Sequence, residues 1–176
     1  MNYATIKNRD IANGIGVRVS LFVSGCTHHC KNCFNKETWD FNFGEKFTQD
    51  TVNEIIKLLE PSYVNGLSLL GGEPFEVQNQ GELLNLLRIV KASYPQKDVW
   101  CYTGYIFDTQ LLKESRARCE HTDEMLSYID ILVDGPYIEE QKDISLQFRG
   151  SKNQRIIDVK KSLAEGEVVL WDKIRK

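Results

Sequence analysis

Three closely spaced thiols are the residues of this sequence best suited to chemistry. Cys26, Cys30 and Cys33 stand in the segment CTHHCKNCFN with a C-x3-C-x2-C spacing. Soft thiolates favour zinc, copper(I) or iron–sulfur clusters, and the sulfurs of one compact loop can each reach a different iron of a cuboidal cluster. Three protein thiolates leave the fourth iron open for a ligand, much as a catalytic zinc keeps a free position. The spacing therefore favours a 4Fe-4S cluster with one open iron.

A zinc site is the main alternative for these cysteines. Its fourth ligand would have to come from His28, His29, Cys101 or Cys119. The histidines fall inside the first gap, where closing a tetrahedron is cramped, and the common zinc spacings are not present. We expect both histidines to be solvated loop residues, Cys101 to be a core thiol and Cys119 to be no ligand. Three unrelated buried thiols are a further alternative, which the polar surroundings disfavour.

A second motif, Gly71-Gly72-Glu73-Pro74, follows the predicted strand Leu67–Leu70. Glycines there let the backbone approach a ligand closely, and a carboxylate at the rim can accept hydrogen bonds from an ammonium group. Taken alone, the segment is more typical of a tight strand-to-helix turn, because Gly-Gly and Glu-Pro are common turn elements. Because the three cysteines are also present, we interpret the motif as a ligand-binding segment.

The elements that must position these motifs alternate between strand and helix. Apolar, β-branched runs predict strands at Val17–Val23, Leu67–Leu70, Val99–Tyr102 and Ile129–Val133. Amphipathic spacing predicts helices from an N-cap at Thr48 to Glu60, over Gly81–Ser93 and from about Asp108 onward. Near the end of the chain, the candidate strands are Arg155–Val159 and Val168–Trp171, around a short helix.

This alternation predicts an α/β fold with a mainly parallel sheet and right-handed crossovers. Each motif lies just past the carboxyl end of a predicted strand. That edge is where α/β sheets and barrels build their sites, because the loops converge there while the strands hold them rigid. We therefore expect the site at the carboxyl edge of the sheet.

Length and composition describe one ordinary domain, which we expect over residues 1–176. The chain is 41% hydrophobic and 27% charged, with a formal net charge of -3 that gives no electrostatic footprint for nucleic acid. It is too short for a complete eight-fold α/β barrel of about 250 residues. With no apolar run of membrane-spanning length and no signal peptide, we expect a cytoplasmic protein. Thiols stay reduced in that compartment, so five cysteines favour metal or redox chemistry over disulfides.

Together the two motifs resemble those of the radical S-adenosylmethionine enzymes. Within that superfamily the chain is similar to the activases of anaerobic ribonucleoside-triphosphate reductase, over most of its length. The matching segments, besides the cysteines and GGEP, are Met1–Tyr3, Asn13-Gly14 with Gly16, Leu21–Cys26, Cys33–Asn35, Trp39, Asp98–Trp100, Thr103–Tyr105, Val133–Gly135, Arg149–Ser151 and Asn153-Gln154. The fold that this resemblance implies is a partial (β/α) barrel of the radical S-adenosylmethionine type.

The resemblance also implies cofactors, a partner and a reaction. It makes Cys26, Cys30 and Cys33 the ligands of a 4Fe-4S cluster whose open iron holds S-adenosylmethionine. The implied enzyme generates a 5'-deoxyadenosyl radical, which abstracts a hydrogen from a glycine of the anaerobic reductase. A low-potential electron donor such as flavodoxin would supply the electron. No side-chain acid or base is required, so the resemblance implies no catalytic residue of that kind.

Further site residues follow from the same resemblance. Gly71, Gly72 and Glu73 would hold the methionyl end of the cofactor. Residues Asn32, Cys33 and Phe34 would border the adenine. Thr103, Asp134 and Arg149, which lie at later strand ends or in matching motifs, are assigned to the cofactor or the partner face.

The chain departs from the family pattern in three places. Ile15 replaces a proline that usually stands between two glycines, which loosens that loop by something like 0.4 to 1 kcal/mol of unfolded-chain entropy. Asn32 stands where many members place an aromatic residue, so we expect Phe34 to supply the stacking. The segment Arg116–Met125 is longer and more polar than expected, which leaves its local structure open.

Two other functions stay open at this point. A short radical S-adenosylmethionine enzyme of the 7-carboxy-7-deazaguanine synthase type would act on a small pterin, and the segments Thr103–Tyr105 and Arg149–Ser151 weigh against it. A non-catalytic zinc-binding or electron-transfer module belongs to a different class of protein. Metal and sulfide content would separate such a module from the enzyme.

Overall fold

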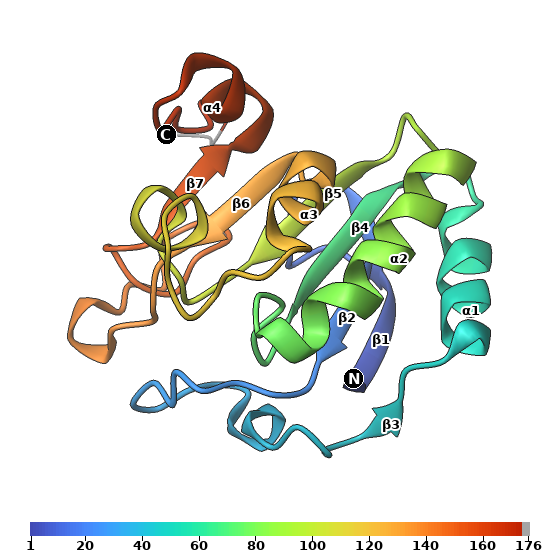
Figure 1. Cartoon of the computed structure of the whole chain (residues 1–176), viewed down its shortest axis with the longest axis horizontal. Coiled ribbons are helices and arrows are strands. Elements are labelled where there is room, and N and C mark those ends of the chain that lie inside the picture. Colours follow the sequence, from blue (N-terminus) through green and yellow to red (C-terminus); the bar gives the residue numbers. More distant parts are fainter. Residues whose placement is uncertain (174–176) are drawn as a thin grey trace.

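A mixed β-sheet forms the centre of the computed structural model, which describes residues 1–173 (Figure 1). Within these residues the sheet has seven strands in the order β3-β1-β2-β4-β5-β6-β7. The strands are β1 (Asn2–Asp10), β2 (Val17–Val23), β3 (Glu45–Lys46), β4 (Val64–Gly71), β5 (Asp98–Tyr102), β6 (Ile131–Asp134) and β7 (Arg155–Asp158). The inner strands β2, β4, β5 and β6 are parallel, whereas β1, β3 and β7 pair antiparallel at the two sides. The expected parallel sheet is thus confirmed for the middle of the fold only.

The first three helices lie in the connections between the parallel strands, and the fourth follows β7. They are α1 (Gln49–Leu59), α2 (Val77–Ser93), α3 (Thr122–Tyr128) and α4 (Val159–Glu165), with shorter turns at Lys36–Trp39, Phe107–Leu111 and Glu139–Gln141. Figure 1 shows α1, α2 and α3 over one face of the sheet. Helix α1 begins at the predicted cap, where Thr48 and Thr51 form a capping box.

The main hydrophobic core lies between these helices and the sheet. Alternate residues of β2, namely Val19, Leu21 and Val23, belong to it and are fully buried. The expected core thiol, Cys101 of β5, lies in the same cluster. Burying one face of every inner strand fixes the register, because a slip of one residue would turn the apolar set away from the helices.

The other face of the sheet carries a smaller, partly polar core. Trp100 packs there edge-on against Phe148 and Trp171, with ring centroids 5.2 Å apart in both pairs. Arg18 of β2 is completely buried on this face, where it donates hydrogen bonds to Ser68 Oγ and to backbone carbonyls. Both faces of the inner strands are therefore covered, as expected of parallel strands.

Several predicted boundaries change in the structure. Strand β4 and helix α2 are longer than predicted, and Val168–Trp171 contributes only a bridge between Leu170 and Ile157. The polar strand β1 was not predicted, because a strand in this outer part of a sheet needs few apolar residues. The helix expected from about Asp108 is wrong, because only the short turn Phe107–Leu111 forms there. The segment Arg116–Met125 forms turns followed by the start of α3. Within residues 1–173, no helix has the length and apolarity needed to cross a membrane.

Candidate functional site

A cavity of about 460 Å³ lies where the parallel strands end. Its walls come from the loops that follow β2, β4, β5 and β6. The residues that line it are Cys26, His28, Cys30, Asn32, Cys33, Phe34, Asn35, Leu70, Gly71, Gly72, Glu73, Tyr102, Thr103, Gly104, Gly135, Tyr137, Lys142, Asp143, Ile144, Leu146, Arg149, Gly150 and Gln154. The structure thus brings together all but one of the predicted site residues.

The strand register explains why the two motifs meet. Val23 at the end of β2 lies opposite Gly71 at the end of β4 in the parallel ladder, so both loops leave the sheet at the same level. Gly25 O then accepts a hydrogen bond of 2.8 Å from the backbone N–H of Glu73. A side chain at Gly72 would meet Gly25 O at 2.6 Å, so this close approach requires glycine.

The cysteine loop turns tightly beneath the sheet edge. Gly25 has φ of +95°, and the backbone N–H of Cys26 donates to Trp39 O. His29 and Asn32 also have positive φ angles, of 49° and 56°, a conformation that is uncommon outside glycine. These bends allow three thiols of one short segment to face a single cavity.

The three thiols differ in their surroundings. Cys26 is 8% exposed, and burial raises its pKa to about 12, although backbone N–H groups of His28 and His29 oppose that rise. Burial also raises the pKa of Cys30, against a hydrogen bond from the backbone of Tyr137. A bound cation favours the thiolate form, so metal binding would release protons here.

The three thiols that line the cavity suit a metal centre that is bound by sulfur ligands from one side. Cys101 is buried in the helix-side core, and Cys119 contacts Gln80 Oε1 of α2 at 3.4 Å, so neither thiol lines the cavity. Within residues 1–173, no three histidine, cysteine or acidic side chains converge closely enough for a single metal ion. The three cavity thiols match the ligand set of a 4Fe-4S cluster with one iron left to another ligand.

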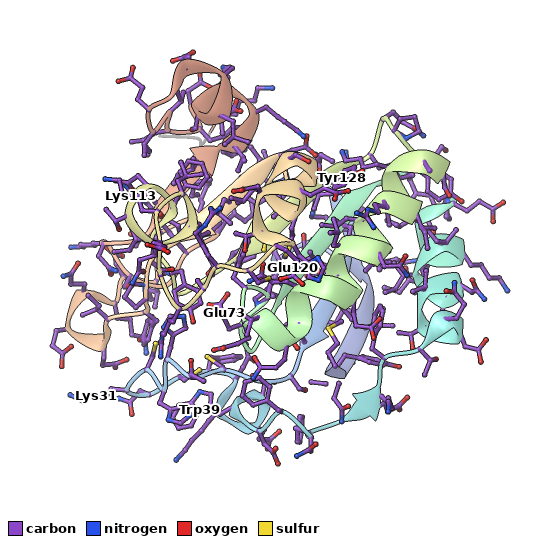
Figure 2. The ribbon with its side chains drawn as sticks, viewed as in Figure 1. Lys31, Trp39, Glu73, Lys113, Glu120 and Tyr128 are labelled. Atoms are coloured by element: carbon purple, nitrogen blue, oxygen red, sulfur yellow. The ribbon has the colours of Figure 1, made fainter. Side chains whose placement is uncertain are left out.

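Glu73 is the most heavily hydrogen-bonded carboxylate of the site. It is 1% exposed, and Figure 2 shows it inside the molecule, facing the loop that carries Lys31 and Trp39. Its Oε1 accepts from the Phe75 backbone and from Thr103 Oγ1, each at 2.8 Å. Its Oε2 accepts from the Gly104 backbone at 2.8 Å and from His28 Nε2 at 3.0 Å. The carboxylate therefore joins the ends of β4 and β5 to the cysteine loop.

The expectation of two solvated histidines is wrong for His28. Its side chain is 12% exposed, and its ring packs against Tyr105 with centroids 4.4 Å apart. His29 is exposed and stacks on Trp39 at 4.5 Å. Sequence alone offered no signal for this difference, because the contacts of His28 come from distant segments.

Asp134 is the predicted site residue that does not line the cavity. Its carboxylate is 1% exposed, accepts from the Phe107 backbone at 2.8 Å and is held by Arg155 at 2.5 and 3.0 Å. Arg155 also bonds to Asp108 at 2.6 Å, and these bonds lower the pKa of Asp108 and raise that of Arg155. The cluster ties β6 and β7 to the turn after β5.

The loop between β6 and β7 supplies cavity residues that sequence reasoning missed. Tyr137, Ile144 and Gln154 lie on this wall, and Lys31 of the cysteine loop pairs with its Glu140 at 3.0 Å. Phe34 is fully exposed and Ile144 is 94% exposed, so both rims of the cavity carry an apolar side chain in solvent. This loop has no strong periodicity, which is why its sequence gave little indication of its place.

Arg149, assigned above to the cofactor or partner face, does lie on the cavity wall. Its Nη1 donates to Gln154 O at 2.8 Å, while its Nε is buried without a hydrogen-bond partner. A guanidinium with a free donor suits a carboxylate ligand.

The sequence matches a known family over most of its length. Residues 12–157 match the model of the 4Fe-4S single cluster domain family. A relative from Enterobacteria phage T4 is 44% identical over 89% of this chain and 93% of its own length. Relatives from Vibrio cholerae and Escherichia coli K12 are 42% and 40% identical, over 89% and 88% of this chain and 97% and 96% of their own lengths. All three are named anaerobic ribonucleoside-triphosphate reductase-activating protein.

Proposed function

The chain belongs to the family of anaerobic ribonucleoside-triphosphate reductase-activating proteins, and on that basis we propose how its site carries out the family's activity. The protein is a radical S-adenosylmethionine enzyme that contains a 4Fe-4S cluster. It generates a 5'-deoxyadenosyl radical and abstracts a hydrogen from a glycine of the anaerobic reductase, which is thereby activated. The observation that carries the assignment of the site is the meeting of three thiols and the GGEP segment on one cavity.

We assign the cluster to Cys26, Cys30 and Cys33. The cluster, when bound, would supply the single electron for cleavage of the sulfonium of S-adenosylmethionine. The redox step thus belongs to the cofactors and not to a side chain. The protein's own part is to hold the thiolates in place and to limit water. Buried Cys26 forms the inner support, while Cys30 and Cys33 lie nearer the solvent.

We assign the methionyl end of S-adenosylmethionine to the segment Gly71–Glu73, whose backbone lies on the cavity floor. The adenine would lie against the segment Asn32–Phe34. Two cations, Lys142 and Arg149, line the cavity, and we assign the cofactor's carboxylate to Arg149, whose guanidinium suits a carboxylate. Thr103 lines the cavity, but its hydroxyl donates a hydrogen bond to Glu73. Asp134 lies outside the cavity lining and accepts a hydrogen bond from the Phe107 backbone of the neighbouring turn. We therefore give Thr103 and Asp134 a supporting role.

The reductase is the protein substrate, and the open side of the cavity is the natural entry for its glycine-bearing segment. A low-potential donor such as flavodoxin would deliver the electron. We also propose that the mixed sheet corresponds to a partial barrel, that residues 1–176 form a single activase domain, and that the protein works in the cytoplasm.

Anaerobic reconstitution with iron and sulfide tests this function. The protein should hold about four irons and four acid-labile sulfides per chain, the content of a 4Fe-4S cluster. After reduction, it should release methionine and 5'-deoxyadenosine from S-adenosylmethionine. One zinc per chain with no sulfide, and no cleavage of S-adenosylmethionine, would instead indicate a non-catalytic module.

A further inference from the structure

We propose that Thr27 and His28, together with Glu73 and Glu76, form a clasp that locks the cysteine loop against the ends of β4 and β5. In this arrangement His28 is a positioning residue that fixes Cys26 relative to the segment Gly71–Glu73, to which the cofactor is assigned. The proposal rests on the assignment of the three cysteines made above, and it adds a role for the residues between the first two of them.

The hydrogen bonds of the clasp run from one short segment to two buried carboxylates. Thr27 donates to Glu76 Oε1 through its backbone N–H at 2.8 Å and through its hydroxyl at 2.6 Å. His28 Nε2 lies 3.0 Å from Glu73 Oε2. An ionised carboxylate only accepts hydrogen bonds, so this bond forms when Nε2 of His28 carries the ring proton. Glu73 and Glu76 are only 1% and 6% exposed, whereas Thr27 is exposed, so only the carboxylate ends of these bonds are buried.

The carboxylate of Glu73 is already saturated by these contacts. An ionised carboxylate offers about four acceptor positions. In Glu73 they are filled by His28, Thr103 and the backbone N–H groups of Phe75 and Gly104. A ligand's ammonium group would have to displace one of these donors to reach it. The carboxylate therefore holds the cysteine loop to the ends of β4 and β5. The cofactor would contact the backbone of the GGEP segment instead.

Shape complementarity points to the same role for His28. A Cβ added at Gly104 would lie 2.7 Å from both Cδ2 and Nε2 of His28, a distance that real side chains do not adopt. The ring of His28 also packs against Tyr105, with ring centroids 4.4 Å apart. The loop after β5 thus contains a slot that is open only because residue 104 is glycine. His28 occupies that slot.

The reactivity of Cys26 in the metal-free protein tests the clasp directly. Cys26 is 8% exposed beside the clasp, whereas Cys101 is fully buried in the core. Alkylation by iodoacetamide, followed by mass spectrometry of each cysteine, therefore distinguishes opening of the loop from unfolding of the whole chain. Local opening raises the rate at Cys26 alone, and global unfolding raises the rate at both cysteines.

Three variants separate the hydrogen bond from other effects. H28N leaves an amide too short to reach Glu73, and H28Q places an amide nitrogen at about the reach of Nε2. H29N makes the same change as H28N at the exposed neighbour, where Asn tolerates the positive φ of His29. We expect H28N to raise the Cys26 rate roughly tenfold, the effect of losing one charge-assisted hydrogen bond on a local opening equilibrium. H28Q should restore most of the protection, and H29N should match the wild type.

Equal Cys26 rates in H28N and H29N, or in H28N and H28Q, would overturn the proposal. If H28N unfolds the chain and exposes Cys101, a second comparison tests whether His28 occupies the slot beside Gly104. G104A should raise the Cys26 rate when His28 is present, because the new methyl group meets its ring, and it should add nothing in an H28A background. The same effect of G104A in both backgrounds would contradict the slot.

The reconstituted protein extends the test to the cofactor. H28N keeps all three thiols, so we expect it to take up iron and sulfide like the wild type. We expect its dissociation constant for S-adenosylmethionine to rise severalfold, with an altered electron paramagnetic resonance signal of the reduced cluster upon binding. Unchanged values in H28N would contradict the positioning role. A wild type that builds no cluster would refute the proposed function, yet the thiol rates of the metal-free chain would still decide whether the clasp exists.

Discussion

At the scale of single residues, the three cysteines have identical chemistry but different positions. Cys26 is buried beside the strand ends, and Cys30 and Cys33 are partly exposed on the loop. Each thiol faces the same cavity, so the loss of any one should remove a metal ligand that no neighbour replaces.

Serine substitution of these cysteines tests their equivalence as ligands. We expect C26S, C30S and C33S each to weaken iron binding by at least ~10-fold, the lower end of what the loss of even an outer-shell partner costs. C119S is the matched control, because Cys119 lies away from the cavity against Gln80. Iron and sulfide counts after anaerobic reconstitution provide the measurement. Full iron content in any of the three ligand variants would remove that cysteine from the set.

The residue scale also shows where sequence reasoning stops. The cysteines and the GGEP segment could be found because their chemistry follows from residue type and spacing. The roles of His28 and Asp134 could not, because their partners lie 45 and 21 positions away, at Glu73 and Arg155. A buried contact of this kind depends on the topology of the whole sheet.

At the scale of elements, Arg155 connects three parts of the chain beside the site. It holds Asp134 of β6 and Asp108 of the turn after β5, and it starts β7. Removing one partner of a buried ion pair leaves the other charge without compensation. The antiparallel attachment of β7 and the turn at Phe107 should both depend on this cluster.

We expect R155Q to lower the free energy of unfolding by about 3 kcal/mol, the lower end of the range for a broken buried pair because Arg155 is partly exposed. The double variant D134N/R155Q should lose less than the sum of its single variants, because each single variant leaves one charge of the pair without its partner and the double variant removes both charges. R88Q is the control, because its pair with Glu124 is exposed on both sides and its loss should lower the free energy of unfolding far less than R155Q does. Denaturant unfolding monitored by circular dichroism measures all four variants. A loss in R155Q no larger than in R88Q would contradict the structural role of the cluster.

Element prediction succeeded where one physical rule dominated. Strand β2 and helix α1 have the predicted boundaries, because a buried apolar run and a threonine cap each act locally. Strand β1 was not predicted, and β7 was predicted at Arg155–Val159 without its direction, because antiparallel pairing with distant partners is not specified by residue pattern alone. The alternation of strand and helix was sufficient to predict an α/β fold, but not the direction of the outer strands.

At the scale of the whole molecule, the fold places its reactive groups at one edge and leaves that edge open. The four inner parallel strands end together, and their loops form a single cavity with three thiols on its wall. Arg18 and Trp100 are buried on the second face of the sheet, where Phe148 and Trp171 pack against Trp100. Because the cysteine loop lines this cavity, we expect a protein substrate to approach from its side.

Electron paramagnetic resonance of the reductase tests this account most directly. The reductase is mixed under anaerobic conditions with the reconstituted chain, S-adenosylmethionine and a low-potential reductant. We predict a glycine-centred radical on the reductase that requires every component and is absent when the C26S variant replaces the wild type. Cleavage of S-adenosylmethionine without any radical on the reductase would contradict the assignment of that protein as the substrate.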